Sequence, residues 1–230
     1  MARQTRNHNI GTLNEGHLHA NLKEWYAEPN DRFEVEIEGF VIDLLRDQLL
    51  IEFQTKNFSI IKRKLTELTE RHYLRLVYPI PQEKWILKRT GEDNQREIRR
   101  KSPKRGTVED VFIELVRIPT LIKRSNFELH VLLTQEEEVR RHEKNRAWRR
   151  KGWLIQERRL IKVVDDTLFR NPQDFSSLLP DTLPREFTTA DLAKAIEKPR
   201  WLAQKMSYCL REMGEIKPAG KQGNAFLYTR

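Results

Sequence analysis

The sequence predicts an α/β protein that carries a second, helical unit at its C-terminal end. Between residues 33 and 56, apolar and polar side chains alternate at a period of two, which is typical of half-buried strands. In segments 13–26 and 200–213, apolar residues recur three or four positions apart, which is typical of amphipathic helices. The segment 171–188 contains three prolines, a composition typical of a boundary. We therefore expect two domains, at residues 1–165 and 166–230.

Composition favours an acidic partner. The chain has 230 residues and a formal net charge of +9, and an excess of Lys and Arg is typical of proteins that bind nucleic acid, although a merely basic soluble protein stays an alternative. No stretch approaches the roughly 20 apolar residues that cross a membrane, so we expect a cytoplasmic protein with no membrane partner. The single cysteine, Cys209, excludes an intramolecular disulfide and a multi-cysteine zinc site.

The first predicted helix runs from about Leu13 to Tyr26. Glu15 shares its apolar face and is expected either to point toward a carboxylate site or to interact with the helix dipole from the first turn. His17 and His19 are two residues apart and therefore face different sides of a helix, so they cannot chelate one metal together. We expect both histidines to be solvated.

A hairpin follows, and it gathers polar side chains. A turn at residues 47–48 would place Asp43 opposite Glu52, and continued alternation would place Gln54 and Lys56 on the same face as Glu52. Two carboxylates opposite each other are destabilising unless a cation compensates them. Mg²⁺ takes oxygen ligands, so we expect Asp43, Glu52 and Gln54 to bind Mg²⁺ or Mn²⁺. Lys56 could then neutralise charge that develops on a phosphate.

A helix from Ser59 to about Arg71 and a strand from Tyr73 to Ile80, ended by Pro81, complete an order of helix, three strands, helix and strand. This order and the polar series resemble the PD-(D/E)XK nuclease superfamily. The resemblance covers roughly the first 80 residues. It implies a restriction-endonuclease-like mixed sheet flanked by helices, a divalent cation and hydrolysis of phosphodiester bonds in DNA.

The resemblance also implies roles for particular residues. Asp43 matches the motif aspartate, although Ile42 stands where proline is expected. The third strand allows two assignments. Either Glu52 is the motif acid and Gln54 stands in the place of the lysine, or Gln54 replaces the acid in a Gln-x-Lys variant and Lys56 is the motif lysine. We prefer the second assignment, with Glu52 as an extra acid near the metal and Glu15 as the acidic residue of the first helix.

The middle of the chain is harder to interpret. A short strand at 85–87, a basic loop at 88–105, a helix at 107–117 and strands at 127–133 and 153–164 are expected. Glu136, Glu137 and Glu138 are placed on a helix, where contiguous residues point in different directions, so they do not predict a second metal site. A second basic cluster, 140–151, includes Trp148 and could contact nucleic acid or pack at a domain junction.

The last 55 residues or so resemble a winged-helix domain. Asn171 can cap a short helix that starts at Pro172, and Thr188 can cap a helix through Ile196. A second helix at 200–213 ends at Gly214, and a hairpin turns at 220–223. In such a domain the second helix enters the major groove. The expected DNA-binding residues are Arg200, Gln204, Lys205, Tyr208 and Arg211 on that helix and Lys221 on the wing.

The two resemblances together imply a Mg²⁺-dependent DNA endonuclease targeted by a winged helix. Its candidate catalytic residues are Glu15, Asp43, Glu52, Gln54 and Lys56. Two alternatives stay open: a DNA-binding protein that has lost catalysis, motivated by Gln54, and a partner-dependent nuclease subunit of a defence, repair or transposition complex. A homodimer is also open, and a protein-binding role for the winged helix competes with DNA binding.

Overall fold

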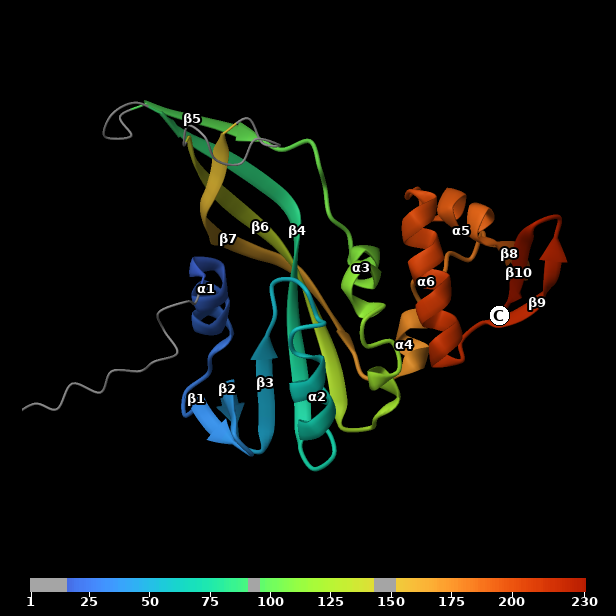
Figure 1. Cartoon of the computed structure of the whole chain (residues 1–230), viewed down its shortest axis with the longest axis horizontal. Coiled ribbons are helices and arrows are strands. Elements are labelled where there is room, and N and C mark those ends of the chain that lie inside the picture. Colours follow the sequence, from blue (N-terminus) through green and yellow to red (C-terminus); the bar gives the residue numbers. More distant parts are fainter. Residues whose placement is uncertain (1–15, 91–95, 143–151) are drawn as a thin grey trace, which may run out of the picture.

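A computed structural model of the chain describes residues 16–90, 96–142 and 152–230. Within these residues the fold is a mixed α/β structure, in which a seven-stranded mixed sheet is flanked by helices and a three-stranded antiparallel sheet lies at the C-terminal end (Figure 1). The strand order of the large sheet is β1-β2-β3-β4-β6-β7, and β5 pairs with β4. The predicted α/β class, a mixed sheet flanked by helices, is confirmed.

The first half of the large sheet is a three-stranded meander followed by a crossover. In order, the elements are α1 (His17–Tyr26), β1 (Arg32–Ile37), β2 (Phe40–Arg46), β3 (Leu49–Phe53) and α2 (Lys62–Leu68). β1, β2 and β3 pair antiparallel, whereas β3 pairs parallel with β4. Because a parallel pair needs a crossover connection, α2 lies between β3 and β4 in the chain.

Helices α1 and α2 cover opposite faces of β3. Leu50 belongs to the apolar cluster that contains Leu65 and Leu68 of α2, whereas Ile51 and Phe53 belong to the cluster that contains α1. This alternation is the period of two expected for a strand buried on both faces. The residues that follow Phe53 therefore lie at the junction of two covered faces.

The strands of the second half are much longer than the sequence patterns predicted. β4 (Tyr73–Thr90), β6 (Phe127–His142) and β7 (Trp153–Phe169) extend beyond the helices and are joined there by β5 (Arg96–Lys101), as Figure 1 shows. Pro81 does not end β4, because the register with β6 shifts between Pro81 and Glu83, and such an irregularity accommodates a residue that cannot donate a hydrogen bond.

The glutamate trio lies in β6 and not in a helix, so that prediction was wrong. Alternation buries Glu136 and Glu138 on one side, where Arg158 and Lys84 respectively provide ion-pair partners. The predicted helix at 107–117 is divided into a 3-10 turn, η2 (Val108–Val111), and α3 (Phe112–Leu115), and η3 (Leu121–Lys123) precedes β6. Trp148 and most of the basic cluster 140–151 lie outside the described residues.

The C-terminal unit has the predicted helices. Its elements are α4 (Pro172–Ser176), β8 (Glu186–Thr188), α5 (Thr189–Ala195), α6 (Arg200–Met213), β9 (Lys217–Gln222) and β10 (Ala225–Thr229), with the sheet order β8-β10-β9. The side chains of Asn171 and Thr188 accept hydrogen bonds from the first turns of α4 and α5, as predicted. Gly214 ends α6 with φ 94°, a left-handed conformation that favours glycine. The hairpin turns after Gln222, slightly later than predicted.

This unit and the large sheet share one continuous apolar core. Leu202, Met206 and Cys209 of α6 belong to the same cluster as sheet residues such as Leu76 and Leu129. The predicted boundary between residues 165 and 166 falls inside β7, which ends at Phe169. The described residues include no helix long and apolar enough to cross a membrane.

Candidate functional site

The candidate site lies where β2 and β3 separate. The pairs Arg46↔Leu49, Leu45↔Leu50 and Leu44↔Ile51 have the predicted register, and the pairing ends one residue before Asp43 and Glu52 would meet. The backbone N–H of Phe53 donates instead to Oδ2 of Asp43, at 2.9 Å. The Asp43 carboxylate therefore takes a place that a backbone carbonyl would occupy in a continued ladder.

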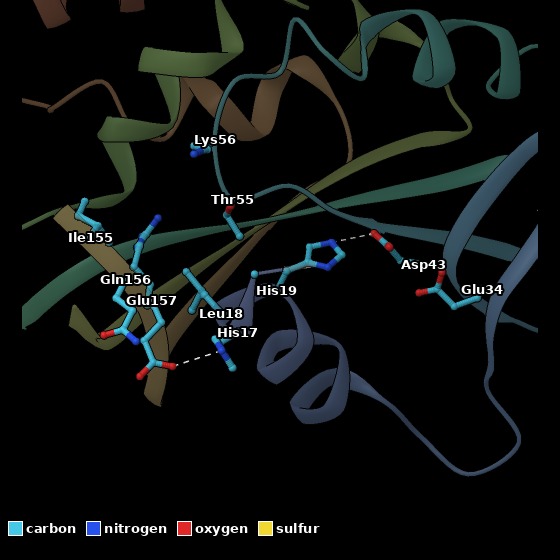
Figure 2. Close-up of a pocket in the computed structure, with 12 residues that line it drawn as sticks. His17, Leu18, His19, Glu34, Asp43, Thr55, Lys56, Ile155, Gln156 and Glu157 are labelled. Carbon is cyan, nitrogen blue, oxygen red and sulfur yellow. Dashed lines mark hydrogen bonds and ion pairs between the residues drawn. The ribbon is translucent and has the colours of Figure 1, made fainter. Parts of the chain in front are cut away.

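His19 of α1 closes over this point. Its Nε2 lies 3.1 Å from Oδ2 of Asp43 and 2.9 Å from the carbonyl oxygen of Phe53, and its side chain is 21% exposed. The expectation that His19 is solvated was wrong, because the turn of α1 that carries it packs on β2 and β3. His17 is exposed as expected and lies 3.3 Å from Glu157 of β7, as Figure 2 shows.

Glu34 and Lys23 extend the ionic cluster, and the sequence analysis missed both. Glu34 lies between the pairs Phe33↔Leu44 and Val35↔Ile42 and therefore opposite Asp43. The ammonium of Lys23 is buried, forms an ion pair with Glu34 and lies 3.9 Å from Oδ1 of Asp43. A signal was present: Lys23 follows His19 by four residues, and residues at that spacing share one helix face.

Glu52 is the most deeply buried acid of the cluster. Its Oε1 accepts a hydrogen bond from Nζ of Lys64 at 2.6 Å, and its Oε2 is buried without a hydrogen-bond partner among the described residues. Burial, together with the neighbouring charge of Asp43, raises the pKa of Glu52 to about 7. Although burial acts in the opposite direction, hydrogen bonds from His19 and from the Phe53 N–H hold the pKa of Asp43 below its usual value. The surroundings therefore shift the pKa values of the two carboxyls in opposite directions.

Gln54 and Lys56 do not share a strand face with Glu52, so that prediction was wrong. β3 ends at Phe53, and the chain then turns through Asn57, which has φ 54°. Nε2 of Gln54 donates to the backbone oxygens of Lys56 and Asn57, at 2.5 and 3.2 Å. Lys56 is exposed at the rim of the site. The lysine that contacts Glu52 is Lys64 of α2. Glu15 lies outside the described residues.

The cluster opens into a cleft of about 580 Å³ between α1 and β7 (Figure 2). Its walls carry groups of both signs: Glu34 and Asp43 on one side, and Lys56 and Arg158 elsewhere in the lining. Arg158 is held by Glu136, with 2.6 Å between Nη2 and Oε2. A cleft with acidic groups at one wall and cations nearby suits a ligand that carries both a metal ion and a phosphate.

Oxygen donors suited to a hard cation are present. Among the described residues no three His, Cys, Asp or Glu side chains are already spaced to hold a metal ion, so a bound ion would require these side chains to shift. The Asp43 carboxylate, the Phe53 carbonyl and the unpaired Oε2 of Glu52 nevertheless lie at the same strand ends. A buried acceptor without a hydrogen bond is costly, and a cation would relieve that cost.

On α6, most of the predicted DNA-binding residues are exposed. Arg200, Gln204, Tyr208 and Arg211 lie on the face opposite the core, and Trp201, which was not predicted, joins them with 49% exposure. Lys205 does not belong to this face, because its Nζ donates to the carbonyl oxygen of Ile113, at 3.0 Å, and so ties α6 to α3.

On the hairpin, Lys221 is exposed, with its Nζ 5.3 Å from the centroid of the exposed Phe226 ring.

The fold and the site define a mixed α/β protein with a buried carboxylate cluster at an open cleft. Residues 16–170 match the family described as "Domain of unknown function (DUF8091)", and the chain belongs to this family. The match ends one residue after β7. The chain is also 28% identical over 225 residues to a protein of Treponema pallidum (strain Nichols) described as "Uncharacterized protein", with 96% of this chain and 87% of that protein covered. No solved structure matches the chain.

Proposed function

We propose that the protein is a metal-dependent DNA endonuclease of the PD-(D/E)XK type, in which the large sheet carries the reaction and the C-terminal unit holds the DNA. The observation that carries the proposal is the pair Asp43 and Glu52 at the separation of β2 and β3, with one Glu52 oxygen buried and unpaired. Such an arrangement of unlike carboxylates beside a cleft is typical of a catalytic site.

Asp43, Glu52 and the Phe53 carbonyl are the groups that would hold the cation. A bound Mg²⁺ or Mn²⁺ would supply charge neutralisation and a water molecule of lowered pKa. Asp43 is ionised, and the Phe53 N–H fixes the position of its carboxylate. Glu52 gives up its proton more readily as a positive charge approaches.

Lys64 takes the role that the sequence analysis gave to Lys56. Its ammonium contacts the buried acid directly, so it can move with Glu52 and neutralise charge that develops on a phosphate. Lys56, exposed at the cleft rim, is suited to binding a flanking phosphate of the substrate. This assignment makes Glu52 the motif acid and gives Gln54 no part in the chemistry.

The C-terminal unit is suited to holding DNA as a winged helix. The order α4, β8, α5, α6, β9, β10 places a hairpin directly after an exposed cationic helix. Arg200, Gln204 and Arg211 offer groups that contact phosphates and base edges. The exposed rings of Trp201 and Tyr208 add stacking surfaces, which would also suit unpaired bases.

A catalytically inactive DNA-binding protein is the second candidate. The observation that favours it is that both acids already have partners within the chain. Lys23 and His19 contact Asp43, and Lys64 contacts Glu52. A partner that rearranges these contacts would correspond to the third alternative, a nuclease subunit active only in a complex.

Incubation of the purified chain with supercoiled plasmid at low salt separates these candidates. We expect nicked or linear product with Mn²⁺ or Mg²⁺ and none with EDTA. Salt-sensitive DNA binding without cleavage under any of these conditions would instead favour the inactive or the partner-dependent protein.

A further inference from the structure

His19 contacts two of the groups that the proposed function assigns to the cation, Asp43 and the Phe53 carbonyl, and this inference rests on that assignment. Two oxygen atoms from different strands, Oδ2 of Asp43 and the carbonyl oxygen of Phe53, converge on a single ring nitrogen, Nε2. Both oxygens are acceptors, so the nitrogen lies where positive charge is favoured.

The distances match a coordination sphere. A metal ion with bonds of about 2.1 Å in octahedral geometry has neighbouring ligand atoms about 3.0 Å apart. Nε2 of His19 lies 3.1 Å from the Asp43 oxygen and 2.9 Å from the Phe53 oxygen. These are also ordinary hydrogen-bond distances, so an ion that displaces the proton on Nε2 would find the imidazole nitrogen and both oxygens beside it.

The imidazole is held in this position. Leu18 and Leu22 of the same helix are buried against β2 and β3, and the His19 ring meets the edge of the Phe53 ring, with 6.0 Å between centroids and an angle of 85°. The ring also lines the cleft, so an ion can reach it from solvent (Figure 2). A fixed ring beside two fixed oxygens is a preorganised set of donors.

We propose that His19 is a ligand of the cation, and that it makes the site prefer a first-row transition ion, such as Mn²⁺ or Co²⁺, to Mg²⁺. Mg²⁺ favours oxygen ligands and retains its water, whereas imidazole nitrogen binds transition ions more strongly in the order Mn²⁺, Co²⁺, Ni²⁺. Replacing one oxygen by a nitrogen therefore changes which ion fills the site.

Calorimetric titration of the full chain with Mn²⁺, Co²⁺ and Mg²⁺ tests this proposal. We expect His19→Ala to lower the affinity for Mn²⁺ and Co²⁺ at least tenfold while the affinity for Mg²⁺ changes little. His17→Ala is the matched control, because His17 lies on the same helix and lines the same cleft but has a 69% exposed side chain. This control should bind all three ions as the wild type does.

A spectroscopic readout on the wild type does not depend on how a variant folds. In wild-type protein with Mn²⁺, electron spin-echo spectroscopy should detect a directly bound ¹⁴N nucleus, and the signal should be absent from His19→Ala.

Four results overturn the proposal. Unchanged ion preference in His19→Ala, or no nitrogen signal in the wild type, removes His19 from the coordination sphere. Tighter binding of all ions in His19→Ala shows that the imidazole only blocks the site. The proposed nuclease function survives each of these results. No binding of any ion by the wild type overturns the cation site, and with it the proposed function.

Discussion

Two carboxylates of the site are held in different protonation states by their surroundings. Asp43 receives hydrogen bonds from a backbone N–H and an imidazole, whereas Glu52 is 6% exposed and has one cation partner. The structure thus pushes the pKa values of two neighbouring acids apart, a pattern typical of sites that bind a metal or move protons.

The raised pKa of Glu52 should make the free energy of unfolding depend on pH. A carboxyl whose pKa is about 7 in the folded chain and near its ordinary value in the unfolded chain binds its proton more tightly when folded. The contribution of this proton to the free energy of unfolding is complete at pH values below about 4.5 and is lost as the pH rises through 7. In EDTA, we expect Glu52→Gln to gain stability over the wild type by roughly 1–3 kcal/mol between pH 5 and pH 8.

Urea unfolding at several pH values in this range measures the difference. Glu36→Gln, on the exposed side of β1, is the control and should follow the wild type. If the free energies of unfolding of Glu52→Gln and wild type differ by the same amount at every pH from 5 to 8, the pKa of Glu52 is not raised as described.

At the residue scale, the sequence predicted that Asp43 and Glu52 lie near each other, and it missed the groups that surround them. Alternation along a strand identifies residues on one face, and the register of a hairpin follows from its turn. Neither indicates where a strand ends, so Gln54 and Lys56 were placed in a strand that stops at Phe53. The role of His19 depends on how α1 docks on the sheet, which no local pattern specifies.

Helix α6 has a core side and an exposed side. Its apolar side joins the core, and Lys205 fastens it to α3 through Ile113. Its opposite side carries Arg200 and Arg211, which are exposed. Helical periodicity predicted this division except at Lys205, because caps at Pro199 and Gly214 bound a long and strongly periodic segment.

DNA binding should depend on this exposed side. Each Arg-to-phosphate contact releases counterions, so the slope of log K against log salt should become shallower by about one for each such contact that is lost. We expect Arg200→Ala with Arg211→Ala to reduce the slope by about two, as measured by fluorescence anisotropy with a duplex.

Lys205→Met is the contrast on the same helix. It should lower the stability of the chain and leave the salt slope unchanged, because its ammonium is bound to Ile113. Equal slopes for the wild type and the double arginine variant would remove α6 from the DNA interface.

Element lengths in the large sheet were poorly predicted for physical reasons. Pro81 predicts the end of a strand, but a register shift accommodates it and β4 continues. The glutamates of β6 were placed in a helix because the residues that compensate their charges, Lys84 and Arg158, are far away in the sequence. Long strands that carry paired charges in place of apolar alternation give little periodic signal.

At the scale of the whole molecule, the two units share a core and should unfold together. The Phe175 ring of α4 stacks on Phe169 of β7, with 4.0 Å between centroids, and also contacts Phe112 of α3. We expect Phe175→Ala to cost about 3–5 kcal/mol, the usual cost of deleting a buried phenylalanine ring.

Calorimetry and near-ultraviolet circular dichroism of this variant measure both its loss of stability and the joint unfolding of the two units. A single transition at a lowered temperature is expected, because the cavity lies in a core common to both units. Phe226→Ala, at an exposed ring of β10, is the control and should leave the melting temperature nearly unchanged. Two separate transitions in the wild type would contradict a shared core.

The measurement that tests the central claim most directly is cleavage and binding of the same DNA by wild type and Asp43→Asn. The substitution keeps the shape of the side chain and its acceptor for the Phe53 N–H, and it removes the charge that a cation needs. The account predicts that metal-dependent cleavage falls at least a hundredfold while DNA affinity at equal salt is unchanged. Full cleavage by Asp43→Asn would place the chemistry elsewhere in the chain.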